Sequence, residues 1–103
     1  MAAKRYDALT IADLMKWQSA AERELPDAPS KEACEAAPEL RSFTTVVRGY
    51  RTVLVGKLDN GQTFAWDINP FMAQQMLLHF LAIGKQMQWL DEHNQIAMPT
   101  PEQ

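Results

Sequence analysis

The sequence predicts an α+β fold: an N-terminal helix, a short antiparallel sheet of two to three strands, and a long C-terminal helix packed on the sheet. Three observations lead to this fold class. Residues 59–61, Asp-Asn-Gly, form a turn signal at the centre of the β-rich run 50–68. A proline then begins an apolar run of helical period over 70–90. Near the N-terminus, Thr10 and Asp13 have the spacing of a capping box.

The N-terminal helix is predicted to begin after Thr10 and to end before Pro26, because proline cannot continue a helix. Its apolar stripe consists of Ile11, Leu14, Met15, Ala21 and Leu25. Residues 26–40 are either a loop or a short helix capped by Ser30. Residues 1–9 are expected to be disordered, as termini without anchoring contacts commonly are.

The hairpin has two possible registers, and the alternation of side chains favours one of them. A two-residue Asn60-Gly61 turn would leave both faces mixed. A three-residue loop with Gly61 in the left-handed region shifts the pairing by one residue and places Gly56 opposite Phe64. One face then becomes apolar, with Tyr50, Thr52, Leu54 and Leu58 beside Phe64, Trp66 and Ile68. We therefore predict the three-residue loop, with Trp66 in the core.

Residues 42–48 are predicted to form a further strand, because they are rich in β-branched side chains. Gly49 separates this run from the hairpin and is either a tight turn or a bulge. The turn is favoured, because three strands against a helix are more stable than an isolated hairpin.

The long helix has apolar residues on two opposite sides. The broader side is predicted to face the core and holds Met72, Ala73, Met76, Leu77, Phe80, Ile83, Gly84 and Met87. The opposite side carries a second row, the back stripe, which consists of Phe71, Leu78, Ala82 and Trp89. Its spacing of 7, 4 and 7 residues suits a seam between helices. The stripe is the predicted interaction surface, covered by the N-terminal helix or by a second copy of the chain.

Length and composition predict one small domain over residues 1–103. Apolar residues make up 47% of the chain and charged residues 22%, which is ordinary for a globular protein. A single cysteine, Cys34, excludes an internal disulfide framework. The start of the chain lacks the apolar run of a signal peptide, and no stretch is long enough for a membrane span. A cytoplasmic location is expected. The polar end, residues 95–103, is expected to be disordered.

Charge is unevenly distributed along a chain whose net charge is −3. Residues 41–70 hold four basic against two acidic side chains, a balance of +2, and the basic ones are Arg41, Arg48, Arg51 and Lys57. These residues suggest the rival hypothesis, a nucleic-acid-binding regulator that uses the basic face of the sheet. The acidic chain and the absence of aromatic residues interleaved with these side chains disfavour it.

No residue cluster in the sequence predicts catalysis, a cofactor or a metal site. Cys34 has no nearby histidine, and the flanking Glu32 and Glu35 disfavour a reactive thiolate. His79 and His93 have no second histidine or cysteine at ligand spacing. The sequence therefore predicts a non-enzymatic protein that acts by protein–protein interaction, either as a homodimer or with another protein partner.

Overall fold

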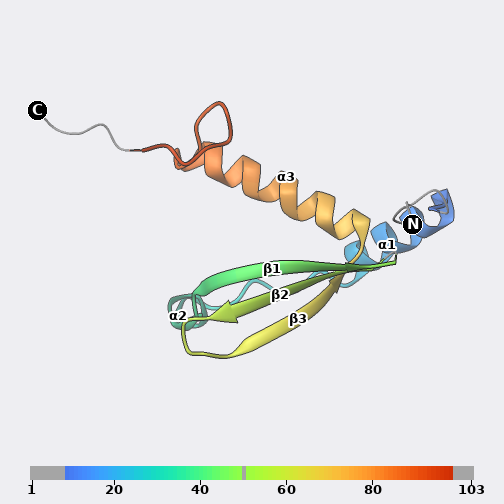
Figure 1. Cartoon of the computed structure of the whole chain (residues 1–103), viewed down its shortest axis with the longest axis horizontal. Helices are drawn as coiled ribbons and strands as arrows, with labels where there is room; N and C mark the ends of the chain where they lie inside the picture. The colour runs from blue at the N-terminus through green and yellow to red at the C-terminus, as the bar shows by residue number, and fades with distance from the viewer. Residues whose placement is uncertain (1–8, 50, 99–103) are drawn as a thin grey trace, which may run out of the picture. The chain divides into compact units, whose positions relative to one another are not determined.

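The structure, a computed structural model, describes residues 9–49 and 51–98. Its elements follow in the order α1 (Ile11–Arg23), α2 (Lys31–Ala36), β1 (Leu40–Arg48), β2 (Arg51–Leu58), β3 (Thr63–Ile68) and α3 (Pro70–Gln86). The predicted α+β order of an N-terminal helix, an antiparallel sheet and a long C-terminal helix is confirmed (Figure 1). The chain divides into two compact units, Met1–Phe71 and Met72–Gln103, where the sequence predicts one domain. That α3 packs on the sheet stays a prediction.

Helix α1 begins at the predicted capping box. The Asp13 amide donates to the Thr10 hydroxyl over 3.1 Å, and the Thr10 amide donates to the Asp13 carboxylate over 3.2 Å. Two of the amides that a helix N-terminus leaves without an intrahelical partner are thereby satisfied. The predicted disorder of residues 1–8 lies outside the described residues.

The connection between α1 and the sheet contains a short helix, one of the two alternatives for residues 26–40. Ser30 caps α2 as expected, because the Ala33 amide donates to its hydroxyl over 3.1 Å. The helix ends just before Pro38, where the chain becomes extended.

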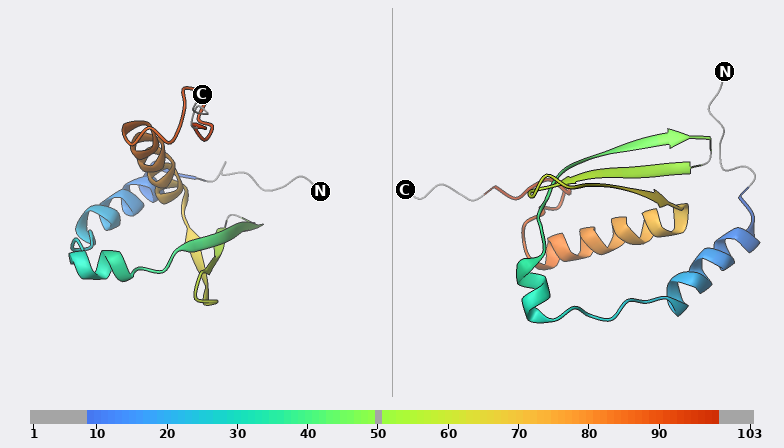
Figure 2. Two further views of the ribbon diagram at one scale, coloured as in Figure 1. Left: turned by 90° about the vertical axis from the view of Figure 1, so that its left-hand side faces the viewer. Right: turned by 90° about the horizontal axis from the view of Figure 1, so that it is seen from below.

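The sheet has three antiparallel strands in the order β1-β2-β3, so that β2 is central (Figures 1 and 2). Gly49 forms a turn rather than a bulge, because Arg48 and Arg51 pair directly across it. Its φ of 62° lies in the left-handed region that two-residue hairpin turns require at the first position. The irregularity of β1 lies instead between Leu40 and Ser42. The favoured meander is confirmed.

The predicted register of the β2–β3 hairpin is also confirmed. Leu54 pairs with Trp66 and Gly56 pairs with Phe64, as the three-residue loop requires. The Gly61 amide donates to the Leu58 carbonyl over 3.0 Å, and Gly61 has a φ of 87°. A left-handed residue after a type I turn is the expected geometry of such a loop.

Gly56 lies beneath an aromatic ring. A Cβ atom at this position would collide with the Phe64 ring and would lie 3.0 Å from Leu40 Cδ1. Phe64 in turn stacks on Trp66, with ring centroids 4.1 Å apart. The glycine is therefore needed to let the Phe64 ring cross the central strand.

The second unit contains most of α3 and the segment that follows it. The helix ends at Gln86, four residues before the predicted end at Leu90. Gln88 adopts a φ of 62°, the Trp89 amide donates to the Gly84 carbonyl over 3.0 Å, and the Gln88 amide donates to the Lys85 carbonyl over 3.2 Å. These two bonds define a Schellman motif, which terminates a helix by a left-handed residue.

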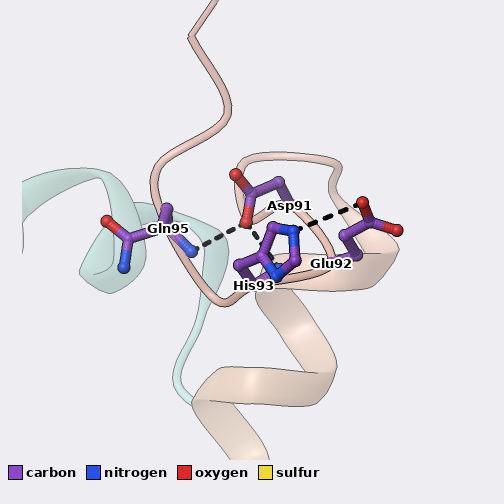
Figure 3. Close-up of polar contacts among 4 residues, drawn as sticks. All are labelled: Asp91, Glu92, His93 and Gln95. Atoms are coloured by element: carbon purple, nitrogen blue, oxygen red, sulfur yellow. Dashed lines mark hydrogen bonds and ion pairs between the residues drawn. The ribbon is translucent and has the colours of Figure 1, made fainter.

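Residues 89–97 form a small hairpin beyond the helix (Figure 3). Leu90 and Ile96 are bridged in antiparallel fashion, and the Ala97 amide donates to the Trp89 carbonyl over 3.0 Å. The Asp91 Oδ1 atom accepts hydrogen bonds from the amides of His93, over 2.8 Å, and Gln95, over 2.9 Å. The sequence predicts disorder from residue 95, whereas the structure places residues 95–97 in this hairpin.

Among the described residues, no hydrophobic side chain is buried. The only buried positions in this part of the chain are two glycines, Gly56 and Gly84. Within the first unit, extensive contacts between elements are confined to the strand pairs β1–β2 and β2–β3. The stripe of α1 is accordingly uncovered, with Ile11 76% exposed. Within each unit, the described residues thus form regular elements without a closed core.

Candidate interaction surfaces

One face of the sheet is apolar, and it is the first candidate surface. Because residues paired directly across antiparallel strands project to the same side, the register assigns the apolar sheet face. Its members are Phe43, Thr45, Val47, Thr52, Leu54, Gly56, Phe64, Trp66 and Ile68. Phe43 is 64% exposed and Val47 is 67% exposed. Contiguous exposed apolar side chains of this size are typical of a surface that another layer covers.

The core position expected for Trp66 is not observed. Its side chain lies on the predicted face, but it is 56% exposed, and the neighbouring Phe64 is half-buried. The physical reason is that no other element of the first unit makes extensive contact with the sheet. The register prediction is therefore confirmed. That α3 covers Trp66 stays a prediction, because α3 belongs almost entirely to the other unit.

The other face of the sheet holds three of the four basic residues that suggested nucleic-acid binding, while Arg41 lies at the irregularity of β1. Arg48 and Arg51 lie directly opposite each other, and Lys57 is on the same face. The Arg51 guanidinium is 3.1 Å from the Asp67 carboxylate, and Arg41 is 3.0 Å from Glu39. Two of the four candidate phosphate contacts thus already have a carboxylate partner, which lowers the positive potential available to a phosphate backbone.

Helix α3 is apolar on both of its long sides. On the predicted core side, Phe80 is 56% exposed, and Leu77, Ile83 and Met87 are exposed as well. On the back stripe, Leu78 is 51% exposed, Ala82 is also exposed, and Phe71 is half-buried. A helix that is apolar all round is stable in water only when it is covered on more than one side.

Trp89 belongs to the back stripe by sequence spacing but not by structure. The Schellman motif ends the helical path at Gln88, so the exposed Trp89 side chain leaves from the hairpin that follows α3. The helical part of the stripe therefore comprises Phe71, Leu78 and Ala82. The sequence signal for this change was weak, because glutamine is an uncommon residue in the left-handed position.

The outer edge of β1 is a surface that the sequence analysis did not identify. The strand order places β1 at one side of the sheet, so one row of its backbone groups has no neighbouring strand among the described residues. All nine residues of β1 are exposed. The predicted meander already implies an edge strand at residues 42–48, but the direction of its outward backbone groups requires the observed register.

The residues capable of chemistry are dispersed on the surface. Cys34 is exposed on α2, and His79 is exposed on α3. His93 Nε2 lies 3.5 Å from a Glu92 carboxylate oxygen, and both side chains are exposed (Figure 3). Within residues 9–49 and 51–98, no three histidine, cysteine or acidic side chains are grouped so that they could hold a metal ion.

No helix within these described ranges combines the length and the apolar character needed to cross a membrane. A comparison of the chain with models of known protein families, with curated proteins and with solved structures finds no match.

Proposed function

We propose that this protein acts by protein–protein interaction, without catalysis, and that it associates with itself. The observation that carries the proposal is the absence of any buried hydrophobic side chain among the described residues, together with the exposure of large apolar side chains in α1, β1, β3 and α3. A folded domain derives most of its stability from apolar burial. We expect further chains to supply part of the missing burial, whether or not α3 also packs on the sheet of its own chain.

The two apolar sides of α3 support the need for a second chain. If the apolar sheet face of the same chain covers one side of α3, as the sequence predicts, the other side remains exposed to water, with Leu78 on one side and Phe80 on the opposite one. A sheet of three strands cannot cover opposite sides of one helix at once. A second copy is the proposed cover, because two-fold dimers are the commonest way to bury a self-complementary surface.

A cytoplasmic location is part of the proposal. It is supported by the lone Cys34, which is an exposed free thiol in the structure. Exposed unpaired thiols are compatible with the reducing conditions of the cytoplasm.

The proposal is tested by measuring the mass of the protein in solution by sedimentation at micromolar concentration. We expect a dimer or a larger assembly. Leu78→Glu is expected to weaken the association, because it places a charge within the back stripe. Gln86→Glu is the matched control, since it adds the same charge at an exposed polar position of the same helix.

A wild-type protein that is folded by circular dichroism and remains monomeric throughout the micromolar range contradicts the proposal. A Leu78→Glu variant that associates as strongly as Gln86→Glu removes the back stripe from the interface, while leaving self-association in place.

A further inference from the structure

No strand among the described residues pairs with the outer edge of β1. The adjacent turn determines which backbone groups point toward this edge. Arg48 and Arg51 close a two-residue loop, and the closing pair of such a loop exchanges both of its backbone hydrogen bonds. Along the strand, alternate residues therefore point their N–H and C=O groups toward β2, namely Ser42, Thr44, Val46 and Arg48. Phe43, Thr45 and Val47 point theirs away from β2, at the outer edge.

This edge lacks the features that prevent strands of different molecules from pairing. Natural edge strands are commonly protected by a charged side chain, a proline or a bulge within the exposed stretch. Residues 42–47 contain no charge and no proline, and the irregularity of β1 lies before this stretch, between Leu40 and Ser42. Strand β3 forms the other edge, but it is shorter, with six residues against nine, and it carries Asp67.

The outer edge of β1 is also complementary to itself. In an antiparallel pair of two β1 strands centred on Thr45, the two Thr45 residues face each other, and Phe43 of each copy faces Val47 of the other. The three pairs use every outward N–H and C=O group from Phe43 to Val47. Threonine pairs and pairs of an aromatic with a β-branched residue are favourable across antiparallel strands.

The same register keeps like charges apart. Arg48 of one copy lies opposite Ser42 of the other, and the two Arg48 residues lie at opposite ends of the shared ladder. Centring the pair on Phe43 or Val47 instead shortens the ladder, because one end of the strand runs past its partner. The Thr45-centred register is therefore the one in which residues 43–47 of the two copies, all uncharged, pair with each other from end to end.

We propose that two copies of this protein join edge to edge through β1, in antiparallel register about Thr45, to form a continuous six-stranded sheet. The inference deepens the proposed self-association by naming the strand and the register. It also makes the two apolar sheet faces into one surface, since Phe43 and Val47 lie on that face in both copies.

Disulfide trapping tests the register in a Cys34→Ser background, which removes the one native thiol. Thr45→Cys is expected to give a covalent dimer on mild oxidation, because directly hydrogen-bonded residues have Cα atoms about 5.5 Å apart, within the range for a disulfide. Thr44→Cys is the matched control. In this register, two such residues are displaced along the strand, and their Cα atoms are separated by more than about 7 Å, beyond that range. Ala65→Cys reports on pairing through β3.

A second pair of variants tests the same edge without oxidation. Thr45→Lys places two like charges opposite each other on the two-fold axis. The variant is expected to fold but to form assemblies of lower mass in solution than the wild type. Thr44→Lys projects to the other sheet face and is expected to associate like the wild type. Hydrogen exchange provides a third readout, since the amides of Phe43, Thr45 and Val47 should be protected only in the assembled protein.

The outcomes separate this inference from the proposed function. If the wild type associates but Thr45→Cys forms no covalent dimer, or if Ala65→Cys cross-links in its place, the β1 inference is wrong and self-association stands. If Thr44→Cys cross-links as readily as Thr45→Cys, the register is wrong. A wild type that is monomeric overturns both.

Discussion

At the scale of single residues, Gly56 shows how the side chain of one strand, Phe64, can require glycine in the neighbouring strand. Glycine within a strand is ordinarily less stable than alanine by about 0.5–1 kcal/mol. Here the Phe64 ring occupies the space that a Cβ atom of residue 56 would need, and Leu40 Cδ1 would lie 3.0 Å from that atom. Replacing Gly56 with alanine would therefore gain the conformational preference of alanine for a strand but add a steric clash with Phe64. The clash has the larger effect on stability.

Gly56→Ala is therefore expected to lower the free energy of unfolding by about 1–3 kcal/mol, the usual cost of overpacking. Urea denaturation followed by tryptophan fluorescence measures the change, because Trp66 stacks on the displaced ring. In a Phe64→Ala background the same substitution should be neutral or stabilising. An equal loss in both backgrounds would show that the ring is not the cause.

Gln88 is the second residue at which local geometry and residue type disagree. It is not a glycine, yet it has a φ of 62° and closes the Schellman motif of α3. Gln88→Gly is expected to stabilise the second unit by about 0.5–1 kcal/mol, because glycine adopts this conformation without a Cβ penalty. Thermal unfolding provides the measurement. Gln74→Gly, at an exposed position inside α3, should instead destabilise the helix by about 1 kcal/mol.

At the scale of elements, the chain uses one loop geometry twice. In the β2–β3 hairpin and in the hairpin of residues 89–97, a left-handed residue follows the turn. It is Gly61 in the β2–β3 hairpin and Asn94 in the other. The first loop is closed by the Leu58 amide, which donates to the Gln62 carbonyl over 2.8 Å, and the second by the Asp91 amide, which donates to the Gln95 carbonyl over 2.8 Å. Glycine and asparagine are the residues that tolerate this conformation best.

The hairpin of residues 89–97 depends on the Asp91 side chain, since one of its oxygens accepts hydrogen bonds from two backbone amides. Asp91→Ala removes that acceptor and is expected to expose the amides of His93 and Gln95 to rapid hydrogen exchange. Asp91→Asn keeps a carbonyl oxygen at the same position and should preserve most of the protection. Equal protection in Asp91→Ala and the wild type would show that the turn does not need the side chain.

At the scale of the whole molecule, the central feature is the amount of apolar surface that the described elements of each unit leave exposed. Neither the stripe of α1, the apolar sheet face nor the two sides of α3 contain a buried side chain among the described residues. Stability that comes from association depends on protein concentration, because the unfolded chains are separate and the folded ones are not.

The midpoint of thermal unfolding is accordingly expected to rise with protein concentration. Differential scanning calorimetry over a hundredfold range of concentration measures this effect, as expected from mass action. The Leu78→Glu and Thr45→Lys variants should unfold at lower temperature and with a weaker dependence on concentration. A midpoint that is independent of concentration would mean that each chain is stable alone.

The sequence by itself determined the features that depend on neighbours along the chain. The Thr10–Asp13 capping box, the Ser30 cap and the three-residue loop at Gly61 all lie where the residue pattern predicts them. Each is decided within a few residues by a hydrogen bond or a backbone preference. The strand register followed as well, because alternation of apolar side chains distinguishes the two faces of a hairpin.

The tertiary structure decided how far the side chains on these faces are exposed. Local patterns show that Trp66 and Phe43 belong to an apolar face, but burial depends on a second layer that can be distant in sequence or belong to another chain. The end of α3 was likewise decided by contacts: a Cβ atom on Gly84 would lie 2.6 Å from Leu90 Cγ, so the chain can fold back over the helix only because residue 84 is glycine. Capping and alternation are short-range effects, whereas burial is a property of the whole assembled surface.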